Sequence, residues 1–117
     1  MNTSLEDKDL DMILVVTTFS TQDEAVILGK NLIEAKLVAC VQISQPFLSI
    51  YKWEGKLEQS TEVSVQLKTI RTHWNAIVKR IQETHPYETP ELISIPINGI
   101  SETYKAWMLE TLEIGKL

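Results

Sequence analysis

The sequence has a single cysteine and few of the features that mark several common classes of protein. One cysteine cannot form a disulfide within its own chain, so a domain held together by disulfides is excluded. A zinc site made of several cysteines from one chain is excluded as well. No apolar run approaches the ~20 residues that a membrane-spanning helix needs. With only four scattered glycines, the chain also lacks a glycine-rich loop that would bind a phosphate.

Basic residues are outnumbered, with 11 Lys and Arg against 16 Asp and Glu. Nucleic-acid surfaces need clustered Lys and Arg, so we expect no nucleic-acid partner. Residues 1–11 hold four acids, one base and few apolar side chains, which predicts a disordered acidic tail. They lack the basic start and apolar stretch of a signal peptide, so we expect a cytoplasmic protein without membrane contact. Residues 12–117 form the single predicted domain, and their charge is nearly balanced.

The first third of this domain predicts a strand, a helix and a second strand. Residues 12–17 and 37–43 are short, apolar and rich in β-branched side chains, which is typical of strands buried on both faces. Between them, Thr21 and Glu24 have the spacing of a capping box at a helix start. Apolar residues follow at helical spacing, and we expect this helix to end near Lys36.

The remaining pattern predicts a hairpin and a second strand–helix–strand unit. Glu54-Gly55 is a two-residue turn signal between extended segments, and residues 62–69 alternate strictly between apolar and polar. A second amphipathic helix follows and must end before His85-Pro86. After a strand over 92–97, Ser101 can cap a last helix. This order predicts an α+β fold, a ferredoxin-like split βαβ sandwich with a long β-hairpin and an extra C-terminal helix.

Three aromatic residues stand on the predicted hairpin strand, namely Phe47, Tyr51 and Trp53. In a monomer they would have to fold inward, because exposed aromatic patches of this size are rare. On the surface of a subunit they would suit an interface instead. Long unpaired strand edges also favour pairing with another chain, so we expect a closed homo-oligomer.

The densest group of functional side chains lies in residues 85–91, a loop stiffened by two prolines. His85 with Glu88 suits a divalent transition metal, because imidazole is a good ligand for copper, zinc and nickel. The alternative is structural: His85 can bond the end of the preceding helix, and Glu88 can pair with a base such as Lys68. Cys40 likewise has two interpretations, a buried small hydrophobic residue or a soft ligand for monovalent copper.

Catalytic signatures are missing from the sequence. There is no Gly-x-Ser-x-Gly turn, no His-Glu-x-x-His pair and no Walker loop. His85 could act as a base oriented by Glu88, but no nucleophile stands beside them. We therefore expect a protein that is not an enzyme and that carries no organic cofactor.

Four segments in this order resemble the CutA family, the divalent-cation-tolerance proteins, from about Ile13 to Leu112. They are ACVQI (39–43), SIYKWEGKL (49–57), EVSVQLKT (62–69) and HPYETPEL (85–92). The resemblance implies a homotrimer of ferredoxin-like subunits in which each long hairpin pairs with a neighbouring sheet. This assembly is similar to that of the PII signalling proteins. It further implies a role in tolerance of divalent cations, with copper as the first candidate.

The resemblance implies two candidate sites. Some members have a cysteine at the end of the first strand and a second histidine before the His-Pro pair, where this chain has Thr17 and Thr84. The remaining metal candidates are His85, Glu88 and Cys40, which would give a weaker and less selective copper site. The alternative is a PII-like sensor or adaptor with a cleft between subunits for a small ligand or a partner segment. Its lining would include Tyr51, Trp53, Lys68, Tyr87 and Glu91.

Overall fold

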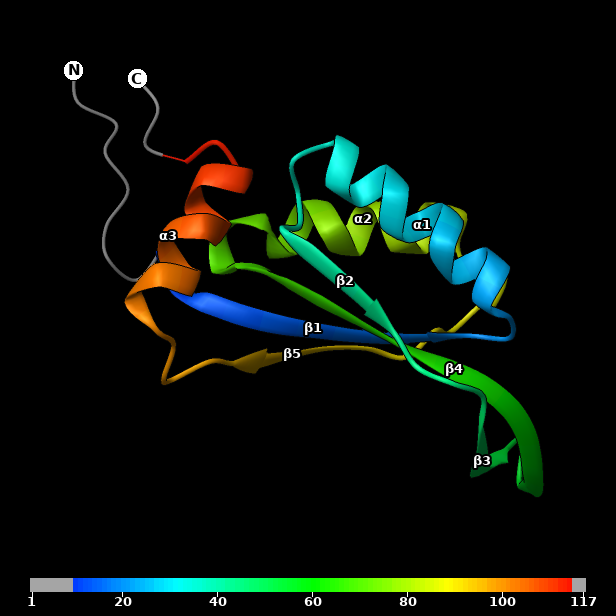
Figure 1. Ribbon diagram of the computed structural model, residues 1–117. Coiled ribbons are helices and arrows are strands. Elements are labelled where there is room, and N and C mark those ends of the chain that lie inside the picture. Colours follow the sequence, from blue (N-terminus) through cyan, green and yellow to red (C-terminus); the bar gives the residue numbers. More distant parts are fainter. Residues whose placement is uncertain (1–9, 115–117) are drawn as a thin grey trace.

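The computed structural model describes residues 10–114 of the chain (Figure 1). Within this range the chain forms five strands and three α-helices, and a short 3₁₀ turn, Arg71–His73, leads into the second helix. The strands are β1 (Met12–Phe19), β2 (Cys40–Ile43), β3 (Phe47–Trp53), β4 (Lys56–Ile70) and β5 (Leu92–Pro96). The helices are α1 (Gln22–Glu34), α2 (Trp74–Thr84) and α3 (Glu102–Thr111).

The sheet has the order β2-β4-β1-β5, and β3 pairs with the first part of β4. Every pairing is antiparallel. The two strands joined by α1, β1 and β2, are separated in the sheet by β4. This is the split βαβ arrangement, so the predicted ferredoxin-like α+β fold is confirmed.

One face of the sheet is covered by α1 and α2 (Figure 1). Side chains alternate along β1, and Ile13, Val15 and Phe19 point into the core under the helices. The helices supply fully buried residues such as Leu32 and Ile77. Burial of these apolar side chains is the main source of the stability of the subunit.

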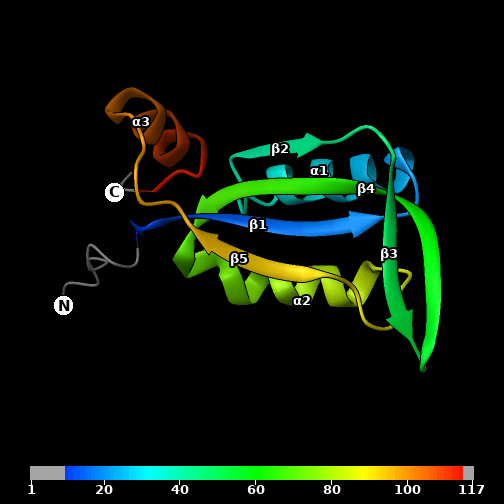
Figure 2. The same cartoon turned by 90° about the horizontal axis from the view of Figure 1, so that it is seen from below.

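The other face of the sheet has no helix over β1, β4 and β5 (Figure 2). Leu14 and Val16 on β1 point to this face and are only half-buried. Ile93 and Ile95, which lie beside them on β5, remain 47% and 42% exposed. The expectation that residues 12–17 and 37–43 are buried on both faces is therefore wrong for a single subunit. Among residues 10–114 no helix covers Leu14 and Val16 on the second face, and β2 is an edge strand on which Gln42 is exposed.

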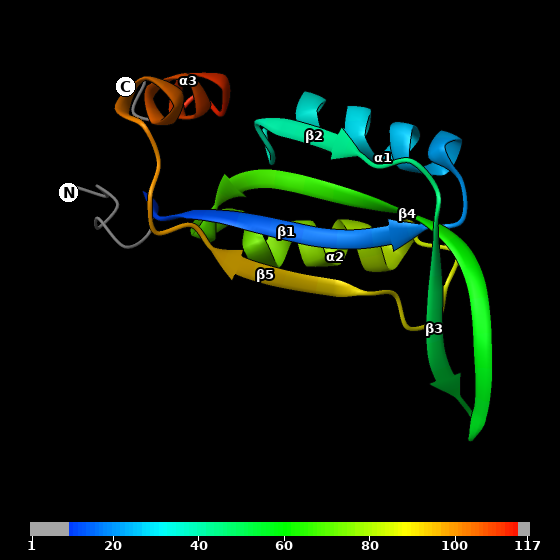
Figure 3. The same cartoon turned by 60° about the horizontal axis from the view of Figure 1, so that its bottom comes forward.

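The hairpin of β3 and the first part of β4 projects from the sheet, away from the helices (Figure 3). Its turn is at Glu54 and Gly55, with φ angles of 51° and 78°. Two consecutive positive φ angles are typical of a type I′ hairpin turn, which matches the right-handed twist of the strands. The predicted turn is thus confirmed, and the hairpin gives the subunit its long dimension of 53 Å.

The predicted caps of two helices, at Thr21 and Ser101, are confirmed. The backbone N–H of Glu24 donates to the Thr21 hydroxyl at 3.2 Å, and that of Tyr104 donates to the Ser101 hydroxyl at the same distance. Helix α1 ends at Glu34, two residues before the predicted Lys36. Within residues 10–114, no helix is both long and apolar enough to cross a membrane.

Helix α3 covers the end of the sheet where β1 begins (Figure 1). Met108 and Leu112 form a second apolar cluster there with Met12 and Ile70, and Leu10 packs against it. The predicted acidic tail, residues 1–11, lies outside the described residues except for its last two. Of these, Leu10 belongs to the packed domain, and the Asp11 carbonyl accepts the Arg71 N–H at 2.9 Å.

Candidate functional site

An open groove of about 720 Å³ lies between the hairpin and the loop of residues 85–91. We call it the hairpin groove. Its lining comes from β1, β3, β4 and the loop: Thr18, Ser49, Ile50, Tyr51, Trp53, Ser60, Glu62, Tyr87, Glu88, Thr89 and Glu91. Its volume lies within the range usual for small-molecule sites.

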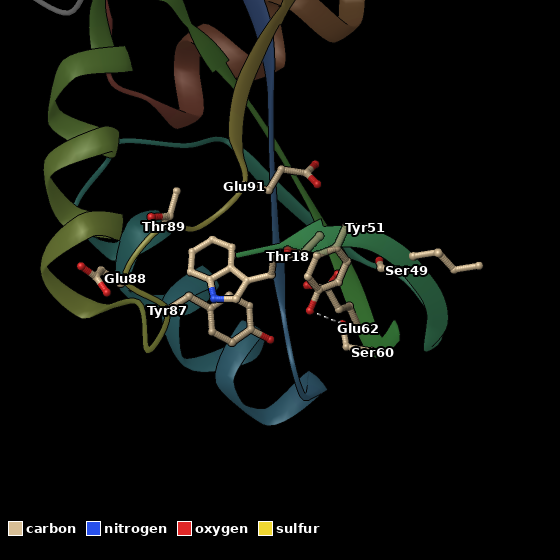
Figure 4. A pocket seen from close by; sticks show the side chains of 11 residues that line it. Thr18, Ser49, Tyr51, Ser60, Glu62, Tyr87, Glu88, Thr89 and Glu91 are labelled. Carbon is tan, nitrogen blue, oxygen red and sulfur yellow. Dashed lines mark hydrogen bonds between the residues drawn. The ribbon is translucent and has the colours of Figure 1, made fainter. Parts of the chain in front are cut away.

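The hairpin wall of the groove follows from the alternation of side chains along β3 and β4. Ser49, Tyr51 and Trp53 share one face of the hairpin, because every second residue of a strand points the same way. Ser49 pairs with Ser60 in the register, so Ser60 lies on that face too. The Tyr51 hydroxyl donates to the Ser60 hydroxyl at 3.3 Å (Figure 4).

The opposite face of the hairpin carries aliphatic side chains among polar ones such as Lys52 and Gln59. Leu48 and Leu57 point there and are 57% and 71% exposed. The hairpin thus has an aromatic and polar face toward the groove and a second face of mixed aliphatic and polar side chains, of which Ile50 also lines the groove. Exposed apolar surface of this kind is typical of an interface with another chain.

The loop wall is held in place by His85, which is buried, with 8% of its surface exposed. Its ring Nδ1 accepts the backbone N–H of Tyr87 at 3.0 Å, so the ring proton is on Nε2. Nε2 then donates to the carbonyl of Thr18 on β1, at 2.6 Å. The ring also stacks on Phe19, with the two centroids 4.3 Å apart.

Tyr87 continues this stack to the groove. Its ring centroid is 4.7 Å from that of His85, and its hydroxyl is hydrogen-bonded to the Ser20 hydroxyl. The loop is therefore tied to the end of β1 by both His85 and Tyr87. Tyr87 and Tyr51 stand on the two sides of Thr18 (Figure 4).

The acidic and basic side chains among the described residues that line the groove are all acidic. Glu62 lies on the hairpin side, Glu91 follows the loop, and Glu88 stands at the outer end beyond Tyr87 (Figure 4). Among the described residues that line the groove, none is Lys, Arg or His. Fields from like charges add in a cleft, so this groove attracts cations.

Most of the predicted cleft residues come together here. Tyr51, Trp53, Tyr87 and Glu91 all line the groove. Lys68 is elsewhere in the subunit, since its neighbours in the sheet are Leu14 and Cys40. Its ammonium group lies over the ring of Tyr104 on α3, 5.6 Å from the centroid, which is a cation–π distance.

The three metal candidates, by contrast, are not gathered in one subunit. Cys40 pairs with Lys68 at the far end of the sheet, whereas His85 contacts Thr18 at the other end of β1. Both ring nitrogens of His85 are in hydrogen bonds, so neither is free to bind an ion. Within residues 10–114 no three His, Cys, Asp or Glu side chains are close enough to hold one metal ion.

The structural alternative for the loop named two contacts, one of His85 with the end of α2 and one of Glu88 with Lys68. The backbone N–H of His85 does bond the end of α2, donating to the Ile81 carbonyl at 2.7 Å. The ring, however, bonds a strand on the other side of the loop. Lys68, the suggested partner of Glu88, lies on Tyr104 instead.

Thr17 and Thr84, which stand where the resemblance implies a cysteine and a second histidine, are not among the residues that line the groove. The Thr84 hydroxyl donates to the Arg80 carbonyl within α2, at 2.8 Å. Thr17 is fully buried on the helix-covered side of β1, and its hydroxyl is the buried side-chain oxygen without a hydrogen-bond partner among the described residues.

Sequence reasoning missed five polar residues of the groove, namely Thr18, Ser49, Ser60, Glu62 and Thr89. A signal for three of them was available. Counting in steps of two from Tyr51 reaches Ser49, and pairing across the predicted two-residue turn reaches Ser60 and then Glu62. Thr18 carried no such signal, because it enters the groove only through the packing of the loop on β1.

Proteins that are similar to this chain in sequence share one description. The family model "CutA1 divalent ion tolerance protein" matches residues 13–111. A "Divalent-cation tolerance protein CutA" of Pyrococcus horikoshii is 37% identical over 99 residues, which cover 85% of this chain and 96% of that protein. One from Escherichia coli K12 is 36% identical over 110 residues, covering 92% of this chain and 98% of the relative.

Solved structures agree with these matches. A CutA1 structure from the psychrotrophic Shewanella sp. SIB1 has a TM-score of 0.83 and 40% identity, covering 86% of this chain and 94% of that one. A CutA structure from Archaeoglobus fulgidus, described as periplasmic, also has a TM-score of 0.83, with 33% identity. It covers 86% of this chain and 98% of that one.

Proposed function

Because the chain belongs to the CutA divalent-cation-tolerance family, we propose that it acts in tolerance of divalent cations as a non-enzymatic homotrimer. The cations, copper foremost, would bind at the hairpin groove. The observation that carries this proposal is the charge of the groove, which has three carboxylates and no basic side chain among its described lining residues. A cleft of one sign raises the local concentration of counter-ions.

The absence of an enzyme activity is part of the proposal. His85 is the side chain nearest in type to a general base, but its Nδ1 already accepts the Tyr87 N–H and its Nε2 proton is donated to Thr18. To accept a proton from a substrate, the ring would have to break the contact that holds the loop. That arrangement supports a structural role better than a catalytic one.

A copper site needs more than one subunit in this proposal. The three carboxylates stand on different sides of the groove, so a single chain does not surround an ion (Figure 4). Glu88 is exposed and can bind an ion from its present position. His85 can join it only when one of its hydrogen bonds opens, and Cys40 would have to come from another part of the trimer.

Two surfaces of the subunit support assembly. The open face of the sheet carries the exposed Ile93 and Ile95, and the hairpin carries the exposed Leu48 and Leu57. Among residues 10–114 no strand pairs with the outer edge of β3, and unpaired edges of this kind favour pairing with another chain. A closed ring of three would bury all of these surfaces. Sedimentation equilibrium tests this, with an expected mass of three times the 13.3 kDa of the chain.

Calorimetric titration with Cu(II) tests the cation site. We expect Glu88→Gln and Glu62→Gln each to weaken copper binding several-fold, because each removes a carboxylate from the groove. Glu110→Gln, on the exposed side of α3, is the matched control and should leave binding unchanged. Equal copper affinity in Glu88→Gln, Glu62→Gln and the control would refute the groove as the cation site.

The size and the aromatic lining of the groove favour a second candidate function, a PII-like sensor or adaptor that binds a small ligand there. A carboxylate or phosphate ligand is disfavoured, because Lys68, the base expected in the cleft, lies on Tyr104 in this subunit. Crystals soaked with candidate ligands would test this function by density in the groove.

We also propose a cytoplasmic location, which the unpaired thiol of Cys40 supports. The relative from Archaeoglobus fulgidus is described as periplasmic, so cell fractionation is the direct test. Recovery of the protein with periplasmic markers would overturn this assignment.

A further inference from the structure

We propose that the hairpin groove binds a small organic cation of the alkylammonium class. The ring faces of Tyr51, Trp53 and Tyr87 would contact the ammonium group, and Glu62 and Glu91 would balance its charge. The inference rests on the proposal above that the groove is the ligand site of the protein, and it names the chemical class of a ligand other than a metal ion.

Two of the three aromatic side chains of the groove, Tyr87 and Tyr51, are held in position by other residues. Tyr87 is held from behind by the His85 ring and at its hydroxyl by Ser20. Tyr51 is held at its hydroxyl by Ser60 on the paired strand. A site whose side chains are held before binding loses little conformational freedom when the ligand enters. The electron-rich faces of such rings attract ammonium groups, and the indole ring of Trp attracts them best.

The charges of the groove select a cation over an anion. Its described lining contains three carboxylates, and an anionic ligand would find no basic side chain among them. Lys68, the base that the family resemblance placed in the cleft, lies over Tyr104 in this subunit and is not among the lining residues. Carboxylates beside aromatic rings are the combination that recognises organic cations in proteins.

The spread of the carboxylates favours an organic cation over a bare metal ion. A metal ion needs several ligands around one point, and no three acidic, His or Cys side chains among residues 10–114 are close enough to provide them. A diamine can reach two separated carboxylates at once, because it carries an ammonium group at each end. Glu62 on the hairpin and Glu91 at the loop provide such a separated pair (Figure 4).

Calorimetry on the full-length protein tests this with three matched probes. Putrescine carries two primary ammonium groups, 1,4-butanediol is its neutral analogue, and tetramethylammonium is a quaternary cation. We expect putrescine to bind and 1,4-butanediol not to bind. If tetramethylammonium binds as tightly as putrescine, most of the binding energy comes from the aromatic rings. If it binds more weakly, most of the binding energy comes from the paired carboxylates. Both results support an organic-cation site.

Two variants with matched controls locate the site. Trp53→Leu should weaken putrescine binding at least tenfold, whereas Trp107→Leu, an equally exposed tryptophan on α3, should not change it. Glu91→Gln should weaken binding several-fold, and Glu110→Gln should not. Sedimentation of each variant checks that assembly is intact, and Tyr51→Leu replaces Trp53→Leu if the latter is not assembled. Three results would each overturn the inference. They are binding of 1,4-butanediol as tight as that of putrescine, unchanged putrescine binding in both aromatic variants, and no binding of either cation.

The same samples separate this inference from the proposed function. Copper titration of Trp107→Leu should match the wild-type protein, because Trp107 lies on α3 and does not line the groove. If copper binding depends on Glu88 while neither organic cation binds, only the inference fails. If putrescine binds and Cu(II) does not, the groove remains a ligand site and the divalent-cation proposal fails.

Discussion

The two faces of the sheet differ in what they bury. Toward α1 and α2, side chains such as Val15, Leu67 and Ile77 are fully buried. On the open face and the hairpin, apolar side chains such as Ile93 and Leu57 are largely exposed, and the hairpin groove lies beside them. One sheet thus combines a face that stabilises the subunit with a face that is available for other molecules.

The sharpest test of this difference uses two leucines of the same strand. Leu67→Ala should lower the free energy of unfolding by about 2–5 kcal/mol, because it leaves a cavity in the core. Leu57→Ala, at the 71% exposed hairpin position, should change subunit stability by less than about 0.5 kcal/mol. Chemical denaturation at one fixed protein concentration measures both values. Equal losses would show that the hairpin is part of a core, and a loss of assembly in Leu57→Ala alone would place it in an interface.

The next test concerns the residue that joins the core to the groove. His85→Ala removes the partners of the Thr18 carbonyl and the Tyr87 N–H, so we expect a loss of about 1–3 kcal/mol. Hydrogen exchange of the Tyr87 amide should become faster, because its acceptor is gone. Thr84→Ala is the control, since its exposed hydroxyl bonds only its own helix. Unchanged exchange at Tyr87 would contradict the anchoring role of His85.

A smaller effect is expected where α1 packs on β2. A Cβ atom at Gly29 would be 2.9 Å from Cγ1 of Val41, so Gly29→Ala must displace that side chain. Overpacking of this kind costs about 1–3 kcal/mol, and the better helix propensity of Ala returns about 1 kcal/mol. We therefore expect a small net loss in thermal unfolding, measured beside Gly99→Ala, which has open space around it. A gain in stability for Gly29→Ala would mean that α1 adjusts its position without cost.

The smallest effect is expected at the hairpin turn, and it should be a gain. Glu54 has a positive φ of 51°, a conformation that Asn adopts more readily than Glu. Glu54→Asn creates the Asn-Gly pair preferred in type I′ turns, so we expect stabilisation by a few tenths of a kcal/mol, on the order of 0.5. Thermal unfolding measures the gain, and ligand binding in the groove should stay the same. Reduced stability would indicate that the Glu54 side chain has a contact in the assembled protein.

Much of the fold was predictable because its signals are local. The cap at Thr21, the turn at Glu54-Gly55 and the alternation of residues 62–69 each depend on neighbours a few residues away. The exposure of Leu14 and Val16 was not predictable, because an apolar strand has the same sequence pattern whether its second face is covered by its own chain or by another.

The candidate site was predictable in part. Tyr51 and Trp53 were expected near Tyr87 and Glu91 from the family resemblance, and the groove brings these four together. Lys68 was expected with them in a cleft between subunits, which stays a prediction; within one subunit the strand register places it beside Cys40. Register depends on the packing of whole strands, so a resemblance of short segments did not reveal it.

By itself, the sequence determined the order of the strands and helices, the apolar core and the position of the hairpin turn, since these follow from periodicity and from residues with restricted backbone angles. Only the tertiary structure decided the roles of the residues in the groove. The ring of His85 is satisfied by Thr18, 67 residues away in the chain, and three carboxylates from the hairpin and the loop meet in a groove whose described lining has no base. Hydrogen bonds and electrostatic fields depend on distance in space, and for residues so far apart in the chain that distance is set by the fold.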